Sequence, residues 1–391
     1  MLSLARAVVA GAAVLAAVSP SAAKGVSLDG VETIFSFGDS YSTVGYSPKD
    51  GVHDLPLLGG TTAGGFNWVQ YLAFSSASTN HSYYDLAQSG ATVNSSVLKH
   101  EAASPLSFEE QVDLWEDFFI GDEAEVKWVP ETTLFTAFFG IKYADMGYTG
   151  LQHQNATEKI PQVVSSYKNL ISKLYEDGAR KFLLLTMPST FRAPYIRSFG
   201  PDMVKTFESN TASFLAQLKT AISDLAARYP DASFARFDVQ PFLDPILDDP
   251  KSFNLTIGDS SCPAYWNTHE PERNSDACEA ALKDYVWLDD YHPTWSVHKL
   301  LAESIQEFLA DESAQASALA NFDAVATSST AEASSTGSTD AIAPIARRGR
   351  HGANRRRRPL HGGSARARRM AWTPQLLAER AKMRRRWAGL A

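Results

Sequence analysis

A serine, an aspartate and a histidine in this sequence have the types and the spacing of a nucleophilic catalytic site. Ser40 follows the apolar run 33–37 in a Gly-Asp-Ser turn, and Asp289 precedes His292 by three residues in the segment WLDDYHPTW. A serine hydroxyl is a weak nucleophile unless a base removes its proton. A carboxylate beside that base fixes its tautomer and stabilises the imidazolium that forms. The three residues therefore predict acyl transfer through a covalent acyl-enzyme.

Each of these features also has a plainer structural explanation. Gly, Asp and Ser are common turn residues, so the segment around Ser40 is equally typical of a turn. Residues 292–294, His-Pro-Thr, are typical of a loop that begins a helix, and His298 one turn later is expected to be structural. The order along the chain favours the catalytic interpretation, because a candidate nucleophile follows the first strand while an Asp and a His lie together near the end of the domain. The Gly-x-Ser-x-Gly elbow of the α/β-hydrolases is absent around Ser40, which disfavours that fold.

The elements that must position these residues alternate between strands and helices. Apolar, β-rich runs predict strands at 33–37, 82–86, 133–139, 181–187 and 233–239. Apolar residues at helical spacing predict helices around 163–174, around 207–225 and from Pro293 to about Leu309. This alternation is typical of βαβ units and a parallel sheet, whose ligands bind at the carboxyl ends of the strands. Ser40 follows such a strand end.

Four segments, taken in order, carry a family resemblance. They are FSFGDSYSTVG at 35–45, GGFNWVQYLA at 64–73, YDLAQSGATV at 84–93 and WLDDYHPT at 287–294. Together they resemble the blocks of fungal GDSL-type esterases of the SGNH hydrolase superfamily and are similar to carbohydrate esterase family 16 acetylesterases. The resemblance implies a flavodoxin-like three-layer α/β/α sandwich around a central, mostly parallel five-stranded sheet.

The resemblance also implies a role for each residue of the site. Ser40 would be the nucleophile, His292 its base, and Asp289 the acid that orients the base. The backbone N–H groups of Ser40 and Gly90 would donate hydrogen bonds to the oxyanion.

The segment after the third predicted strand departs from the family. GDSL-type esterases show Gly-x-Asn-Asp there, with the Asn side chain as the third oxyanion donor, whereas this chain reads FFGIKYADMG at 138–147. Gly140 matches, but Lys142 stands where the Asn is expected and Tyr143 where the Asp is expected. Loss of one such donor lowers the rate by about a hundredfold to a thousandfold. Lys142 is either a cationic replacement in an altered oxyanion hole or a solvent-facing residue beside a weakened site.

The N-terminus has the pattern of a secretory signal peptide. Arg6 precedes the apolar run 7–18, and a Ser-Ala-Ala cleavage pattern follows, so residues 1–23 are expected to be removed. The run is too short to span a bilayer, and no transmembrane segment is expected; an N-terminal anchor helix is the alternative. Four sequons support a secretory route and are expected to be glycosylated, at Asn80, Asn94, Asn155 and Asn254. We therefore expect a secreted, extracellular glycoprotein.

The chain contains two cysteines, Cys262 and Cys278, which lie in one loop-rich segment. In an oxidising compartment they are expected to form a disulfide that closes a surface loop. Two buried free thiols are the alternative, which secretion disfavours.

The charge of the chain is divided between an acidic body and a basic tail. From Arg347 onward there are 15 Lys or Arg residues and one acid, which leaves 21 basic and 43 acidic residues in 1–346 and a net charge of −22 there. Such a body repels phosphate, so nucleic-acid binding is not expected of it. The tail is interpreted as disordered, with adhesion to acidic wall polymers or membrane as the alternative. We place the hydrolase domain at 24–311, a disordered Ser/Thr/Ala-rich linker at 312–345 and the basic disordered tail at 346–391.

No cofactor or metal is expected. The glycine-rich segment 59–65 lacks the Lys-Ser/Thr ending of a phosphate-binding loop, and the His269-Glu270 pair has no second His at the spacing of a zinc peptidase. We expect a monomeric serine esterase, and the resemblance implies acetyl esters of plant cell-wall carbohydrates as its substrates. A lipase or phospholipase of the same superfamily, and a catalytically weak wall-binding protein on a hydrolase scaffold, are the alternatives.

Overall fold

The computed structural model describes residues 25–54, 58–74, 81–98, 106–141 and 156–320 of the 391-residue chain. The chain divides into two compact units, Met1–Tyr46 with Pro56–Asn321 and Ser47–Leu55 with Phe322–Ala391. The second unit contains the short helix η1 (Pro48–Asp50). All that follows concerns the described residues of the first unit, which holds the predicted site.

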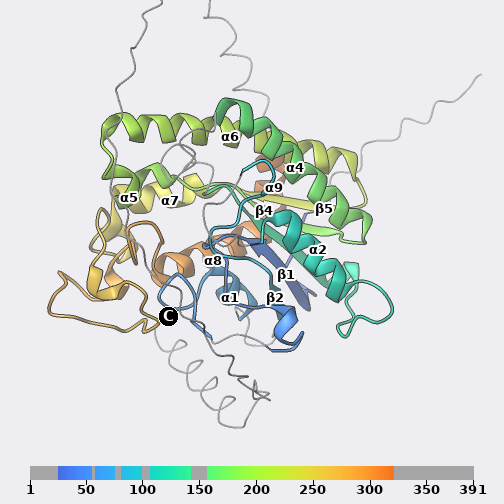
Figure 1. The fold of residues 1–391 in the computed structure, drawn as a ribbon, viewed down its shortest axis with the longest axis horizontal. Helices are drawn as coiled ribbons and strands as arrows, with labels where there is room; N and C mark the ends of the chain where they lie inside the picture. Colours follow the sequence, from blue (N-terminus) through green and yellow to red (C-terminus); the bar gives the residue numbers. More distant parts are fainter. Residues whose placement is uncertain (1–24, 55–57, 75–80, 99–105, 142–155, 321–391) are drawn as a thin grey trace, which may run out of the picture. The chain divides into compact units, whose positions relative to one another are not determined.

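A five-stranded parallel sheet forms the centre of this unit (Figure 1). Its strands are β1 (Thr33–Gly38), β2 (Ser82–Asp85), β3 (Thr133–Phe138), β4 (Lys181–Leu185) and β5 (Ser233–Phe237). They lie in the order β2-β1-β3-β4-β5, and every neighbouring pair is parallel. The five predicted strands are confirmed, with ends that differ by one or two residues. Nearly all strand residues are buried, as expected of a parallel sheet covered on both faces.

Helices cover both faces of the sheet, which completes the predicted three-layer sandwich (Figure 1). The helices are α1 (Trp68–Ala73), α2 (Phe108–Phe119), α4 (Ala156–Glu176), α5 (Pro194–Arg197), α6 (Pro201–Arg228), α7 (Val239–Asp248), α8 (Trp295–Ala310) and α9 (Glu312–Ala320). Short 3-10 helices are η2 (Pro130–Thr132), η3 (Thr190–Arg192), η4 (Pro250–Phe253), η5 (Pro263–Tyr265) and η6 (Leu282–Asp284). Helices α2, α4 and α6 lie side by side on one face, and α1 and α8 pack together on the other.

An aromatic row crosses the sheet on the face covered by α2. Neighbouring strands place Phe35 opposite Tyr84 and Phe135, and Phe135 opposite Phe182, which pairs in turn with Phe234. Successive ring centroids in this row lie between 4.8 and 6.0 Å apart. Such contacts add to the stabilisation from burial alone, so the row holds the five strands in register.

The end of the domain lies beyond the expected boundary at Asp311. Residues 312–320 form helix α9, which packs against β5 and α8. Gln315 is buried there, accepts a hydrogen bond from the Val26 N–H at 2.8 Å and donates one to the Val26 carbonyl at 3.0 Å. The Ala- and Ser-rich composition suggested a linker, but a single buried amide ties this helix to the first described residues of the domain.

Helix α8 begins later than the sequence predicts. Thr294 is its N-cap and Trp295 its first residue, whereas Pro293 was expected in the first turn. Pro293 instead forms an antiparallel bridge with Trp287, and the Leu288 N–H donates to the His292 carbonyl at 2.8 Å. The segment before α8 is therefore a tight loop that folds back on itself.

Several other sequence expectations bear on this part of the chain. No helix among the described residues is long and apolar enough to cross a membrane. Within the same residues, no group of three or more His, Cys, Asp or Glu side chains is placed to hold a metal ion. Asn94 is half-buried and Asn254 is exposed, while Asn80 and Asn155 lie outside the described residues. Glycosylation stays a prediction at all four positions.

Candidate active site

The turn that carries Ser40 is built by the aspartate before it. Strand β1 ends at Gly38, and the Asp39 side chain accepts a hydrogen bond from the Tyr41 N–H at 3.0 Å. The Asp39 carbonyl accepts from the N–H groups of Ser42, at 3.1 Å, and Thr43, at 3.0 Å. A side chain at Gly38 would lie 3.0 Å from the Phe138 carbonyl oxygen and 2.8 Å from the Ser42 hydroxyl. The sequence thus forms one compact turn that places Ser40 at the carboxyl end of the sheet.

The second part of the site is the loop that carries Asp289 and His292. One Asp289 carboxylate oxygen lies 2.8 Å from His292 Nδ1. The other accepts the N–H groups of Tyr291 and His292, both at 2.7 Å. Burial alone would raise the pKa of the Asp289 carboxyl, but the hydrogen bonds from His292 and the backbone outweigh it and hold this pKa below its ordinary value. The aspartate therefore stays ionised against the imidazole and leaves Nε2 as the available ring nitrogen.

Several contacts hold this loop against the Ser40 turn. The Tyr41 hydroxyl donates to the Tyr291 carbonyl at 2.6 Å, and the rings of Tyr41 and His292 lie 5.8 Å apart. The Thr62 hydroxyl donates to the Ser40 carbonyl, and the next residue, Ala63, accepts from the Trp295 N–H at 2.7 Å. No hydrogen bond joins the Ser40 hydroxyl to His292 within the part of the chain that the structure describes. The structure nevertheless brings the predicted nucleophile, base and acid into one place.

The two predicted backbone donors are also positioned there. Gly90 adopts a left-handed conformation, with φ of 85°, in the turn after β2. The Gln88 N–H donates to the Gly38 carbonyl at 3.2 Å, which holds this turn beside the end of β1. Among the described residues, neither the Ser40 N–H nor the Gly90 N–H donates a hydrogen bond. Two such groups beside a nucleophile can receive a developing oxyanion. The third expected position, Lys142, lies outside the described residues.

The similarity to known proteins agrees with this geometry. Residues 34–305 match the model of the family described as GDSL-like Lipase/Acylhydrolase. The chain belongs to this GDSL family. It is therefore a carboxylic ester hydrolase with a parallel five-stranded α/β/α fold, as the four sequence segments indicated.

Individual relatives of this GDSL hydrolase are distant. An acetylesterase from Thermothelomyces thermophilus is 25% identical over 282 residues, covering 70% of this chain and 87% of the relative. A thermolabile hemolysin from Vibrio parahaemolyticus is 22% identical, covering 71% of this chain and 64% of the relative. Among solved structures, an acetylxylan esterase from Geobacillus stearothermophilus matches with a TM-score of 0.39 and 14% identity, covering 72% of this chain and 95% of the other.

Sequence reasoning assigned no role to several residues that position the hydrolase site. Asn67 caps helix α1 and donates to the carbonyls of Ser42 and Thr43, which fixes the back of the nucleophile turn. The Gln111 amide exchanges two hydrogen bonds with the Gly38 backbone, at 3.0 and 2.9 Å. Asn67 lies in a segment that carried the family resemblance, which was the available signal. No sequence pattern marked Gln111, because the sequence does not distinguish a buried glutamine on an amphipathic helix from an exposed one.

His298 takes the structural position expected of it. Its side chain is 2% exposed, and Nδ1 accepts a hydrogen bond from the Trp68 N–H at 3.3 Å. Burial, with a smaller contribution from nearby His292, lowers the pKa of His298 to about 3. His298 therefore ties α8 to α1 as a neutral side chain.

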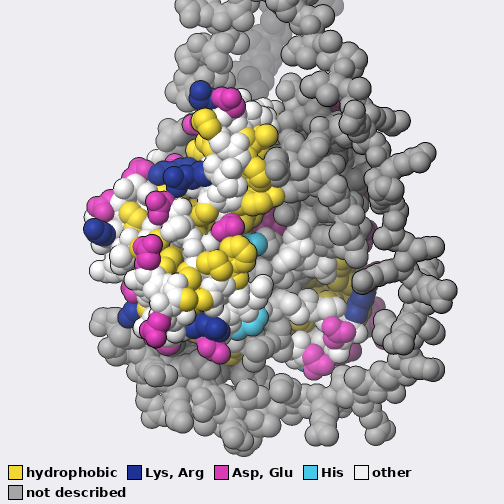
Figure 2. Space-filling model, turned by 60° about the vertical axis from the view of Figure 1, so that its left-hand side comes forward, with side chains coloured by type: hydrophobic (Ala, Val, Ile, Leu, Met, Phe, Trp, Pro, Cys, Tyr) yellow, Lys and Arg dark blue, Asp and Glu magenta, His cyan; other side chains and the backbone are white. Residues whose placement is uncertain are grey.

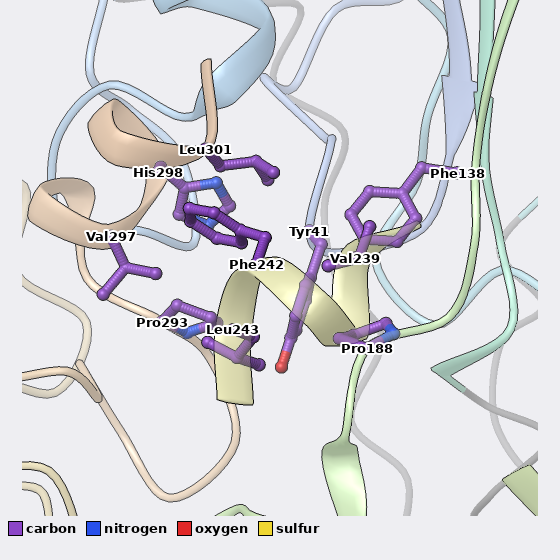
Figure 3. A pocket seen from close by; sticks show the side chains of 10 residues that line it. All are labelled: Tyr41, Phe138, Pro188, Val239, Phe242, Leu243, Pro293, Val297, His298 and Leu301. Atoms are coloured by element: carbon purple, nitrogen blue, oxygen red, sulfur yellow. The ribbon is translucent and has the colours of Figure 1, made fainter. Parts of the chain in front are cut away.

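An apolar cavity lies behind the catalytic loop of this hydrolase (Figure 3). Its volume is about 20 Å³, and Tyr41, Pro293 and His298 are among the side chains that line it. A single water needs about 10–15 Å³ measured in this way, so the cavity is too small for an acyl chain. It is packing space beneath the site.

The predicted disulfide is present and lies next to the site. Cys262 and Cys278 are bonded, which closes a loop over a sequence separation of 16. This loop docks on the catalytic segment, because the Trp295 indole N–H donates to the Pro271 carbonyl at 3.0 Å. The rings of Tyr265 and Tyr285 add an edge contact at 5.8 Å. The disulfide loop is therefore part of the surroundings of the active site.

Proposed function

We propose that this protein is a secreted serine acetylesterase that acts on acetylated cell-wall carbohydrates, with Ser40 as its nucleophile. One observation carries the proposal: an ionised Asp289 bonded to His292 Nδ1, on a loop clamped against the turn of Ser40. This is the arrangement that activates a serine hydroxyl in hydrolases of unrelated folds.

The reaction follows from these positions in two steps. The Ser40 hydroxyl oxygen attacks the ester carbonyl while His292 Nε2 takes its proton, and Asp289 stabilises the imidazolium. The oxyanion forms beside the N–H groups of Ser40 and Gly90. The bond to the alcohol then breaks, and the alcohol leaves with the proton from His292. Water, deprotonated by His292, attacks the acyl-Ser40 ester and releases the acid and the free serine.

The proposals that the acyl group is acetyl and that its carrier is a carbohydrate rest on the sequence and on similarity to known proteins. The acetylesterase from Thermothelomyces thermophilus covers most of the same domain, and the four sequence segments resemble carbohydrate esterases. The N-terminal signal pattern and the disulfide support secretion.

Hydrolysis of a chain-length series of p-nitrophenyl esters tests this function. The wild-type protein should cleave the acetate best, and Ser40→Ala should be inactive. Equal activity of the two proteins would reject the nucleophile, and a strong preference for long acyl chains would reject the acetylesterase assignment in favour of a lipase.

Lys142 provides a second test within the same series. If it stands in for an oxyanion-hole Asn without fully replacing it, Lys142→Asn should raise kcat by about a hundredfold or more. A fall in kcat would show instead that the lysine ammonium is an effective donor.

A further inference from the structure

Trp266 is an unusual side chain for the surface of this domain. Among the described residues, it and Val129 are the large hydrophobic side chains that are exposed, at 42% and 50%. Val129 immediately precedes η2, which leads into the amino end of β3. Trp266 instead lies in the disulfide loop, between Cys262 and Cys278. A single exposed hydrophobic side chain is common on a protein surface. Trp266 is distinguished by its place in the disulfide loop, which contacts the catalytic segment through the hydrogen bond from Trp295 to Pro271.

Trp266 is connected to the catalytic loop by two hydrogen bonds. Its indole N–H donates to the Ser261 hydroxyl at 3.2 Å, and that hydroxyl donates to a carboxylate oxygen of Asp290 at 2.8 Å. Asp290 is the neighbour of Asp289, and its carbonyl accepts from the Tyr195 N–H at 2.9 Å. The edge of the indole is thereby fixed to the loop that carries the predicted base, while the residue as a whole stays 42% exposed.

The loop that carries Trp266 is held in place from several directions. The disulfide closes it, and the Tyr265 hydroxyl donates to the Ala280 carbonyl at 2.8 Å and accepts the Ser275 N–H at 3.1 Å. Just before the loop, the Gly258 carbonyl accepts the Trp287 indole N–H at 2.9 Å. A ligand that contacts Trp266 therefore meets a ring that is already ordered, which lowers the entropic cost of binding.

We propose that Trp266 is the platform on which a sugar ring of the substrate stacks, beside the site where its ester is cleaved. This proposal rests on the proposed function and names the part of the enzyme that recognises the carbohydrate. The C–H face of a pyranose matches the flat face of an indole, whose own polar edge is occupied by Ser261. Ser261 and Asp290 place a hydroxyl and a carboxylate next to the ring, where sugar hydroxyls can bond to them.

The surroundings favour a sugar over a lipid. Figure 2 shows one side of the molecule, where exposed hydrophobic side chains lie among acidic, basic and histidine side chains. A lipid surface needs a continuous apolar patch, and anionic lipids are repelled by an acidic body. A neutral sugar, by contrast, uses both the aromatic face and the polar groups beside it.

The test compares two acetyl esters with the same chemistry and different carriers. We would measure kcat/KM on an acetylated xylo-oligosaccharide and on p-nitrophenyl acetate for the wild type, Trp266→Ala, Trp266→Phe and the control Val129→Ala. Trp266→Ala should lower the ratio of kcat/KM on the oligosaccharide to kcat/KM on p-nitrophenyl acetate about tenfold, mainly by raising KM for the oligosaccharide. Trp266→Phe should restore most of the ratio, and Val129→Ala should leave it unchanged.

The possible outcomes separate this inference from the proposed function. If the wild type cleaves neither ester, the proposed function fails. If it cleaves both and Trp266→Ala leaves the ratio unchanged, only the platform is overturned. The platform is overturned equally if Trp266→Ala lowers both values in parallel, which marks a structural role, or if it weakens only the cleavage of long-chain esters, which marks a lipid contact.

Discussion

The loop at 287–294 and the helix α8 that follows it each carry a histidine, and the two side chains meet opposite surroundings. His292 is 22% exposed and has a carboxylate oxygen 2.8 Å from Nδ1. His298 is 2% exposed, and its Nδ1 accepts a backbone N–H. Both residues are histidines, and they lie close together in the chain.

The difference shows which features make a histidine a base. A base must accept a proton and hold the resulting cation, which Asp289 allows at His292. At His298 burial opposes the cation so strongly that the pKa falls to about 3, and Nε2 has no partner among the described residues. Access and a charged partner, rather than the residue alone, therefore separate the proposed catalytic histidine from the structural one.

Removing the imidazole at each of the two positions tests this comparison most clearly and should give the largest difference in activity. His292→Ala should lower kcat on p-nitrophenyl acetate by about 10⁴-fold or more, because no group remains to take the serine proton. His298→Asn should keep kcat within a few fold, since the amide oxygen can replace Nδ1 as an acceptor for the Trp68 N–H. Steady-state kinetics of the two variants measures the contrast, and similar losses in both would contradict it.

Asp289→Asn tests the partner rather than the base. The amide keeps the size of the side chain but removes the charge that stabilises the imidazolium, so kcat should fall by about 10²–10⁴-fold. Circular dichroism should show an intact fold. Activity within threefold of the wild type would mean that His292 does not depend on this carboxylate.

The pH dependence of stability should sharpen the comparison from the side of His298. An unfolded histidine takes up a proton below pH 6.5, whereas folded His298 does so only near pH 3, so unfolding binds a proton and stability falls as the pH falls. Because of this histidine alone, the free energy of unfolding should be about 2 kcal/mol lower at pH 5 than above pH 6.5. Urea unfolding at pH 7 and pH 5 measures the loss, which should be smaller by that amount in His298→Asn. An equal loss in both proteins would show that His298 does not titrate in this way.

The smallest expected effect concerns the hydrogen bond at His298. His298→Leu fills a similar volume but leaves the Trp68 N–H without its acceptor. Its free energy of unfolding at pH 7 should therefore be about 1 kcal/mol lower than that of His298→Asn. The same unfolding experiment compares the two. Equal stabilities would mean that the long 3.3 Å contact contributes nothing.

The sequence predicted this site best where its parts are local. Asp289 and His292 lie three residues apart on one loop, and the five strands are buried apolar runs, so both could be read from short segments. The contact of the Tyr41 hydroxyl with Tyr291 joins residues 250 positions apart, and no local pattern marks it. Helix α9 was missed for a similar reason, because the buried Gln315 finds its hydrogen-bond partner at Val26, 289 positions earlier in the chain and outside any strand. Long-range hydrogen bonds to buried polar groups thus account for most of what the sequence did not show.

Covalent labelling of Ser40 tests the central claim most directly. A serine-reactive organophosphate such as paraoxon should add one equivalent to the wild type, and peptide mapping by mass spectrometry should place the adduct on Ser40. Ser40→Ala should stay unlabelled, and His292→Ala should react far more slowly, while His298→Asn should label like the wild type. Labelling of Ser40→Ala at the wild-type rate, or an adduct on another residue, would contradict the assignment of Ser40 as a nucleophile activated by His292.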